Sequence, residues 1–84
     1  MAKVIVYTKD HCPYCRMAKD LLSSRKIAFE EIRIDLDDSK RDEMIRLSNQ
    51  RTVPQIFINE KSIGGYDDLA ALVKSGNLEG LLKT

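Results

Sequence analysis

The stretch "KVIVYTKDHCPYC", residues 3 to 15, joins an apolar run to two closely spaced cysteines. Residues 3 to 8 are rich in β-branched side chains and stop at a polar break, which predicts a buried strand of the kind common in parallel sheets. From Pro13 onward the apolar residues recur at steps of three and four, which predicts a helix that ends near Arg25. The cysteines therefore lie between a strand and a helix, in the first half of a βαβ unit.

The rest of the chain continues this alternation of strands and helices. We expect a half-exposed strand over 27–35, a short helix over 37–49, strands over 54–59 and 61–65, a helix over 67–76 and a packed segment over 78–84. This order predicts an α/β fold in one domain over residues 1–84, with a right-handed crossover in the first βαβ unit. The side chains expected to face the core from the helices and the last segment are Tyr14, Met17, Ala18, Leu21, Leu22, Met44, Ile45, Leu47, Leu78, Leu81 and Leu82.

Composition narrows the classes of function. The chain has 84 residues with 14 Lys and Arg against 13 Asp and Glu, so its net charge of +1 predicts neither a nucleic-acid face nor an anionic membrane partner. The N-terminal apolar run is too short for a signal peptide or a spanning helix, so we expect a cytoplasmic location. Permanent disulfides are rare in that compartment, which leaves redox or metal chemistry for the two cysteines.

The position of Cys12 favours redox chemistry. Pro13 is suited to the first position of a helix, so Cys12 is expected at the helix N-terminus, where free backbone N–H groups and the helix dipole stabilise a thiolate. We therefore expect the pKa of Cys12 to lie below that of an ordinary thiol, with Lys9 and Arg16 adding positive potential. Cys15 follows one turn later with less solvent. This asymmetry predicts that Cys12 attacks a disulfide and that Cys15 resolves the mixed disulfide.

Two alternatives compete with a redox pair. A closed zinc site needs about four ligands, whereas this chain offers Cys12, Cys15 and His11 without a second CxxC motif. A structural disulfide is the other alternative, and the expected compartment disfavours it. We expect His11 to be a solvent-facing neighbour of the thiol, because exchange needs no further base once Cys12 is ionised.

Three motifs in register resemble those of the dithiol glutaredoxins: "CPYC" after "VYTKD", then "TVPQIFI", then "GGYDDL". The likeness covers essentially the whole chain and is strongest with the short bacterial glutaredoxins of the third type. It implies a thioredoxin-like fold with a four-stranded mixed sheet flanked by helices, in the order βαβαββα with a short C-terminal helix. It also implies a monomer that uses glutathione as its electron donor, without a metal, to reduce disulfide-containing or glutathionylated proteins.

The resemblance also implies a glutathione site. Pro54 would follow a cis peptide bond and turn the Val53 backbone toward a bound peptide. Helix N–H groups after the paired glycines would bind the γ-glutamyl carboxylate, and Asp68 would bind its ammonium group, with Asp67 as helix cap or second ligand. The glycyl carboxylate of glutathione would be bound by Lys9, just before the CxxC motif, and by Arg41. The full set of expected glutathione-binding residues is Lys9, Tyr14, Arg41, Thr52, Val53, Pro54, Gly65, Tyr66, Asp67 and Asp68.

Two routes of reduction follow from this resemblance. A glutathionylated protein would need Cys12 alone, whereas a protein disulfide would also need Cys15. Thioredoxins are disfavoured because the chain has no Trp, and thioredoxin-reductase-dependent redoxins are disfavoured by the "GGYDD" motif. A binding module that holds a [2Fe–2S] cluster between two chains remains an alternative, although Pro13 occupies a position where such sites commonly have glycine.

Overall fold

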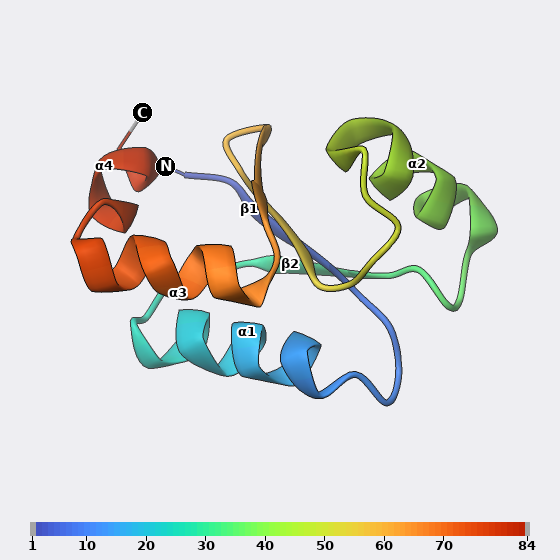
Figure 1. Cartoon of the computed structure of the whole chain (residues 1–84), viewed down its shortest axis with the longest axis horizontal. Coiled ribbons are helices and arrows are strands. Elements are labelled where there is room, and N and C mark those ends of the chain that lie inside the picture. Colours follow the sequence, from blue (N-terminus) through green and yellow to red (C-terminus); the bar gives the residue numbers. More distant parts are fainter. Residues whose placement is uncertain (1, 84) are drawn as a thin grey trace.

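The computed structural model of the chain describes residues 2–83. Its elements alternate as strands and helices, and the chain folds into one sheet with helices on both sides (Figure 1). In chain order they are β1 (Val4–Thr8), α1 (Pro13–Ser24), β2 (Glu30–Arg33), α2 (Asp38–Ser48), β3 (Gln55–Ile58), β4 (Lys61–Gly64), α3 (Tyr66–Ser75) and α4 (Leu78–Leu82).

The sheet is mixed and four-stranded, with the strand order β2-β1-β3-β4. β1 pairs with β2 in parallel and with β3 in antiparallel register, and β3 pairs with β4 in antiparallel register. The expected α/β fold, with its four-stranded mixed sheet, is confirmed. Because β3 runs opposite to β1, the end of β1 lies beside the beginning of β3 and the end of β4.

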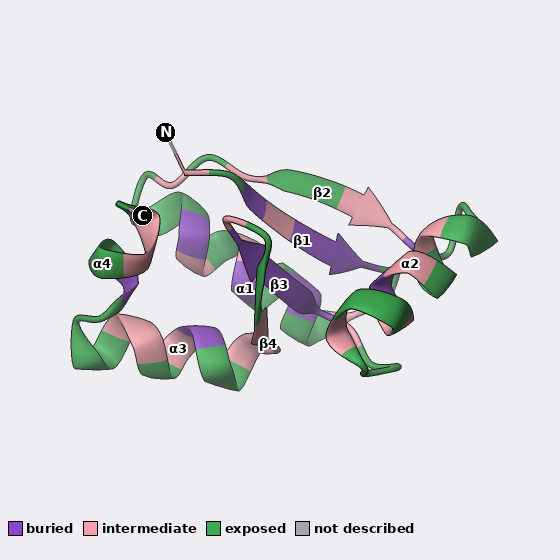
Figure 2. Cartoon of the chain, turned by 90° about the horizontal axis from the view of Figure 1, so that it is seen from above, coloured by how far each residue is buried: buried purple, intermediate pink, exposed green. Residues whose placement is uncertain are grey.

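The two central strands are buried on both faces, which explains why their sequences are apolar throughout (Figure 2). On one face, Val4, Val6, Ile56 and Ile58 pack with the buried residues of α1, α3 and α4. On the other face, a smaller cluster packs under α2; its buried members are Tyr7, Ile34, Met44 and Phe57. Successive residues of a strand point to opposite faces, so β1 and β3 supply both clusters.

Tyr7 carries the one buried hydroxyl of the smaller cluster. Its OH donates to Glu43 Oε2 at 2.6 Å, and its ring meets Phe57 edge-on. Burial, together with the hydrogen bond to Glu43, raises the pKa of Tyr7 well above its usual range. The same hydrogen bond lowers the pKa of Glu43, so the pair ties α2 to the sheet as a neutral phenol on a carboxylate.

Some expectations from the sequence were wrong in detail. The strand expected over 27–35 is confined to Glu30–Arg33, because only this part pairs with β1. Tyr14, Met17 and Leu47 were expected to face the core, yet their exposed fractions are 57%, 43% and 49%. Only a narrow stripe of each helix contacts the sheet, and helical spacing alone does not locate its edges.

The C-terminal segment packs as expected. Leu78 is buried, and Leu81 and Leu82 pack against the larger cluster, whereas residue 84 lies outside the described residues. Within residues 2–83 the helices are too short and too polar for any of them to cross a membrane.

Replacing Leu22 tests how much the larger cluster stabilises the fold. Its side chain is fully buried between α1 and the sheet, so Leu22→Ala is expected to lower the free energy of unfolding by about 2–5 kcal/mol. Leu47→Ala, the same chemical change at an exposed site, is expected to alter it by no more than about 0.5 kcal/mol. Urea denaturation followed by circular dichroism measures both. Equal losses in the two variants would contradict this packing.

Candidate active site

Three connecting segments meet at one edge of the sheet. They are the loop 9–12 after β1, the loop 49–54 before β3 and the turn at Gly65 after β4. Strand direction brings them together, because β1 and β4 end where β3 begins. The three motifs singled out in the sequence are therefore neighbours in space.

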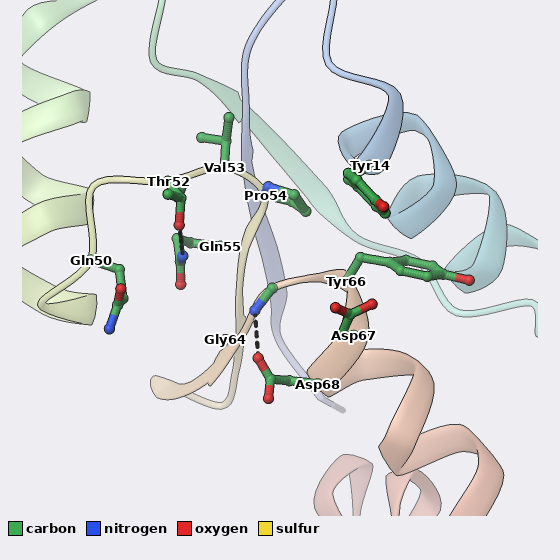
Figure 3. Close-up of a pocket in the computed structure, with 11 residues that line it drawn as sticks. Tyr14, Gln50, Thr52, Val53, Pro54, Gln55, Gly64, Tyr66, Asp67 and Asp68 are labelled. Atoms are coloured by element: carbon green, nitrogen blue, oxygen red, sulfur yellow. Dashed lines mark hydrogen bonds between the residues drawn. The ribbon is translucent and has the colours of Figure 1, made fainter.

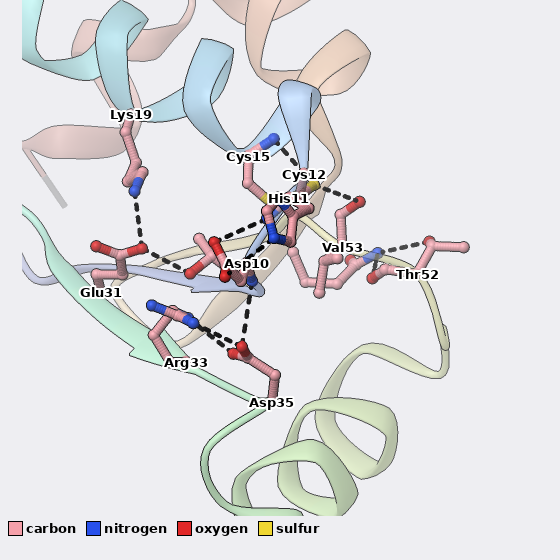
Figure 4. Close-up of a disulfide and its surroundings, with 12 residues drawn as sticks. Asp10, His11, Cys12, Cys15, Lys19, Glu31, Arg33, Asp35, Thr52 and Val53 are labelled. Atoms are coloured by element: carbon pink, nitrogen blue, oxygen red, sulfur yellow. Dashed lines mark hydrogen bonds and ion pairs between the residues drawn. A yellow bond between two sulfur atoms is a disulfide. The ribbon is translucent and has the colours of Figure 1, made fainter.

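The cysteine pair lies at the N-terminus of α1 (Figure 4). Cys12 is the N-cap and Pro13 is the first helical residue, as predicted. Cys12 and Cys15 form a disulfide, with their Cα atoms 5.2 Å apart. Cys12 Sγ accepts a hydrogen bond from the Cys15 N–H at 3.2 Å, so the sulfur satisfies one of the free donors of the helix N-terminus.

Exposure separates the two sulfur-bearing residues. Cys15 is only 2% exposed, whereas Cys12 is half-buried. Cys12 Sγ also lies 3.9 Å from the carbonyl oxygen of Val53, in the loop before β3. The more accessible sulfur is therefore the one at the helix terminus, in agreement with the asymmetry inferred from the sequence.

The loop 9–12 is held in place by an ion pair between the last residue of β2 and the segment that follows it. Arg33 donates two hydrogen bonds to Asp35, at 2.7 and 2.6 Å, and the Asp10 N–H donates to the same carboxylate at 3.3 Å. The Arg33 guanidinium holds the pKa of Asp35 well below its usual range. His11 has a left-handed backbone with φ of 55°, and its side chain is exposed as expected.

A second polar contact joins α1 to β2. Glu31 Oε2 accepts hydrogen bonds from Lys19 Nζ at 2.9 Å and from the buried hydroxyl of Thr8 at 2.7 Å. These donors hold the pKa of Glu31 below its usual value. The middle of α1 is thus tied to the edge strand by charged groups.

The loop before β3 contains the expected cis peptide bond between Val53 and Pro54. The side chain of Gln55, the first residue of β3, holds this loop by hydrogen bonds. Its side chain is 3% exposed, and its Nε2 donates to the carbonyl oxygen of Thr52 at 3.0 Å and to the Thr52 hydroxyl at 3.3 Å. Its Oε1 has no hydrogen-bond partner among the described residues. The Gln55 amide therefore holds Thr52 in place through its Nε2, while its buried Oε1 stays without a hydrogen bond, which lowers the stability of the fold.

Three hollows lie at this edge of the sheet, and Cys12 lines two of them. Two are named by the charge of their lining residues and the third by its place. The acidic groove, with a volume of about 480 Å³, is drawn in Figure 3. It is lined by Tyr14, Gln50, Thr52, Val53, Pro54, Gln55, Gly64, Gly65, Tyr66, Asp67 and Asp68. The basic groove shares Thr52 and Val53 with it, and is lined in addition by Lys9, His11, Cys12, Pro13, Ile34, Arg41 and Arg51.

The third hollow, the outer groove, lies beyond the basic groove. It shares Lys9, His11, Cys12 and Pro13 with the basic groove and no residue with the acidic groove. Its remaining lining residues are Asp10, Cys15, Arg16, Lys19, Glu31 and Arg33. The three hollows therefore follow one another in the order acidic, basic, outer.

The structure places all ten residues expected to bind glutathione around two adjoining hollows. Eight line the acidic groove, including Tyr14 and Tyr66, whose ring centroids are 6.0 Å apart. The other two, Lys9 and Arg41, line the basic groove beside Cys12. Arg41 is on α2 and Lys9 follows β1, so only the fold brings these cations together.

The start of α3 differs from expectation in one respect. The helix begins at Tyr66 with Gly65 as N-cap, and the Gly65 N–H donates to Asp68 Oδ2 at 3.0 Å. The capping role expected of Asp67 therefore falls to Asp68, because the third residue of a helix is the one that reaches back to the N-cap. Asp67 is exposed at the rim of the acidic groove.

Gly64 makes this turn possible. Its φ is 115°, and a Cβ at this position would overlap the Asp68 carboxylate that caps α3. Sequence reasoning missed Gly64 as a site residue, together with Gln50, Arg51 and Gln55. Gly64 belongs to the "GG" motif itself, and the other three lie within two residues of "TVP", so proximity to a motif was the available signal.

Comparison with known proteins agrees with the family resemblance of the sequence motifs. Residues 4–63 match the family model described as Glutaredoxin. The chain is 55% identical over 83 residues to "Glutaredoxin 3" of Escherichia coli strain K12, which covers 99% of this chain and 100% of that protein. It is 48% identical to "Glutaredoxin" of Neisseria meningitidis serogroup A, with 98% of each chain covered.

Solved structures agree in fold. The glutaredoxin of Brucella melitensis superposes with a TM-score of 0.87 at 46% identity, covering 100% of this chain and 91% of that one. A buckwheat glutaredoxin in complex with glutathione gives a TM-score of 0.88 at 29% identity, covering 98% and 77%.

Gly64→Ala tests the turn between β4 and α3. Positive φ and the Asp68 carboxylate both oppose a Cβ, so the free energy of unfolding is expected to fall by about 1–3 kcal/mol. Gly80→Ala is the matched control, since nothing surrounds Gly80 within 4 Å and alanine favours the helix α4. Urea midpoints measure both, and a Gly64 variant as stable as the control would show that the turn tolerates a side chain.

Proposed function

The chain belongs to the glutaredoxin family of glutathione-dependent disulfide oxidoreductases, and we propose that it reduces two kinds of disulfide by routes that share Cys12 as nucleophile. The arrangement that carries this proposal is the half-exposed Cys12 at the N-terminus of α1, beside the buried Cys15, where it lines the basic groove that adjoins the acidic groove at Thr52 and Val53. A thiolate at such a terminus is stabilised by free N–H groups and by the helix dipole.

Glutathione fits the two grooves in one direction. Its γ-glutamyl end carries a carboxylate and an ammonium group, which suit the N–H groups at the start of α3 and the Asp68 carboxylate. Its glycyl carboxylate suits Lys9 and Arg41 in the basic groove. Its cysteine then lies at Val53, within reach of Cys12, where the Val53 backbone can pair with a peptide.

The first route uses one cysteine. The Cys12 thiolate attacks the glutathione sulfur of a protein–glutathione disulfide, so that the Cys12–glutathione bond forms and the protein leaves as a thiolate. A second glutathione thiolate then attacks the glutathione sulfur bound to Cys12. Oxidised glutathione forms, and the Cys12 thiolate is regenerated.

The second route uses both cysteines. Cys12 attacks a protein disulfide and forms a mixed disulfide, while one protein thiolate is released. Cys15, after losing its proton, attacks Cys12 Sγ and expels the second protein thiolate, which leaves the Cys12–Cys15 disulfide. Two glutathione molecules then reduce this disulfide in succession and become oxidised glutathione. The proximity of Cys15 favours closure over escape of the mixed disulfide.

Replacing each cysteine separates the two routes. Cys15→Ser is expected to keep most of the activity toward a glutathionylated peptide and to lose turnover of a protein disulfide. Cys12→Ser is expected to lose both, because it removes the nucleophile. Oxidised glutathione formation, coupled to glutathione reductase and NADPH, measures the activities.

The opposite pattern, in which Cys15→Ser abolishes both activities and Cys12→Ser neither, would reverse the assignment of roles. If the unmodified protein turns over neither substrate with glutathione, the two grooves do not form a glutathione site. Thioredoxin reductase is then the donor to test.

Asp68→Asn tests the ammonium-binding role. The amide oxygen can still accept from the Gly65 N–H, so the cap is retained while the charge is lost. The KM for glutathione is expected to rise by about three- to tenfold with little change in kcat. Asp20→Asn, on the exposed surface of α1, is the matched control and is expected to leave KM unchanged. An unaltered KM in the Asp68 variant would remove this residue from the site.

A further inference from the structure

The hollows around Cys12 differ sharply in charge. The acidic groove is lined by Asp67 and Asp68, and no cation lines it among the described residues. The basic groove is lined by Lys9, Arg41 and Arg51, with no carboxylate. A fourth cation, Arg16, lines the outer groove. We call Lys9, Arg16, Arg41 and Arg51 the basic rim.

Two carboxylates, Asp10 and Glu31, line the outer groove together with Lys9 and Arg16, but in the described part of the chain neither forms an ion pair with the basic rim. Within residues 2–83, none of its four members forms an ion pair. The other two cations of the outer groove, by contrast, are each paired, Lys19 with Glu31 and Arg33 with Asp35. The rim is therefore the part of this surface whose positive charge is available to a partner, although the whole chain has a net charge of only +1.

Arg16 is a cation near the N-terminus of α1, where helices disfavour positive charge. It belongs to the first turns of α1, whose first turn carries no acidic residue. A cation near a helix N-terminus is unfavourable, because the dipole makes that end positive. Positions that break such a rule without a compensating contact are expected at functional sites. Two anions can compensate for Arg16 at this position: the Cys12 thiolate, which lines the same groove, and an anion that arrives with the substrate.

Glutathione alone does not account for the rim. Its glycyl end offers one carboxylate, which Lys9 and Arg41 suffice to bind, and this leaves Arg16 and Arg51 without a partner. Arg16 lines only the outer groove, which lies beyond the basic groove from the γ-glutamyl end. A longer chain than glutathione would reach it.

The direction of a bound peptide follows from the loop before β3. Gln50 at the start of this loop lines the acidic groove; from Arg51 onward the loop passes from the basic groove, through Thr52 and Val53, which line both grooves, to Pro54 and Gln55 in the acidic groove. A peptide that pairs with Val53 in antiparallel fashion enters over the acidic groove and leaves over the basic groove, with its reactive cysteine near Cys12. This is also the direction proposed for glutathione. Residues after the reactive cysteine therefore meet the basic rim, and residues before it meet Asp67 and Asp68.

We propose that this charge gradient selects protein disulfides in which the cysteine attacked by Cys12 is followed by acidic side chains, and disfavours those in which it is preceded by them. The proposal rests on the proposed function, since it concerns the substrates of the same thiol. The selection acts on the formation of the mixed disulfide, before glutathione takes part.

Isomeric peptides test the gradient without a change in net charge. The substrates are symmetric disulfides of five-residue peptides that have blocked termini and a cysteine in the middle. In one isomer two aspartates follow the cysteine, and in the other they precede it. The pre-reduced Cys15→Ser protein is mixed with each disulfide without glutathione, and acid-quenched samples give the rate of mixed-disulfide formation. At low ionic strength, the isomer with aspartates after the cysteine is expected to react about three to ten times faster.

Two further readouts separate charge from position. With lysine in place of aspartate, the preference is expected to invert, because ammonium groups before the cysteine then meet Asp67 and Asp68. In about 1 M salt, where the screening length is about 3 Å, the ratio of the rates of the two isomers is expected to approach one for both the aspartate and the lysine peptides. Equal rates for the aspartate isomers at low salt, or the same preferred side for aspartate and lysine, would overturn the proposal.

Single variants assign the effect to the basic rim. Arg16→Gln and Arg51→Gln are each expected to reduce the aspartate preference by about twofold or more. Arg25→Gln, at the opposite end of α1, is the matched control and is expected to retain it. Because each variant is judged by the ratio of two isomers, a general change in Cys12 reactivity cancels. An equal reduction in the control would overturn the assignment to the rim.

Failure of this proposal and failure of the proposed function give different results. Selection is measured in a single half-reaction without glutathione, whereas the proposed function is measured by turnover with glutathione reductase. A protein that turns over with glutathione but treats both isomers alike would leave the proposed function standing and remove the charge selection.

Discussion

Backbone hydrogen bonds hold β1 and β3 antiparallel, from Val4 opposite Ile58 to Tyr7 opposite Gln55. Both strands are buried on their two faces, so this pairing lies between the two apolar clusters and fixes the register of each. It also places the loop that follows Thr8 beside the loop that precedes Gln55. Cys12 and Val53 are thereby brought together from positions far apart in the sequence.

The chemistry of the site depends on how this edge of the sheet is completed. The N-terminus of α1 supplies N–H groups to Cys12, while ion pairs made by residues of β2 hold the loop before the helix and the middle of the helix. The opposite side is formed by Gly64 and the capped start of α3, which bring carboxylates to the acidic groove. Cys12, the proposed nucleophile, lines the basic groove next to the acidic groove, and a substrate that spans both grooves meets groups of opposite charge.

Much of the fold could be predicted from periodicity and from the cap residues. Pro13 located the start of α1, and the apolar runs located β1 and β3, because a strand buried on both faces needs no polar alternation. Tyr14, Met17 and Leu47 were wrongly assigned to the core. Their helical spacing is compatible with a broad apolar face, and only the actual width of the helix contact with the sheet shows that they are exposed.

The sequence by itself located the cysteine pair and predicted its asymmetry, because proline and the helix N-terminus act on Cys12 through local backbone geometry. Three motifs in register also determined the family. Only the tertiary structure decided which distant residues share the site: the capping role of Asp68, the support from Gln55, and the convergence of Lys9, Arg41 and Arg51. Those contacts depend on strand order and direction, which set distances between residues that no local pattern along the chain specifies.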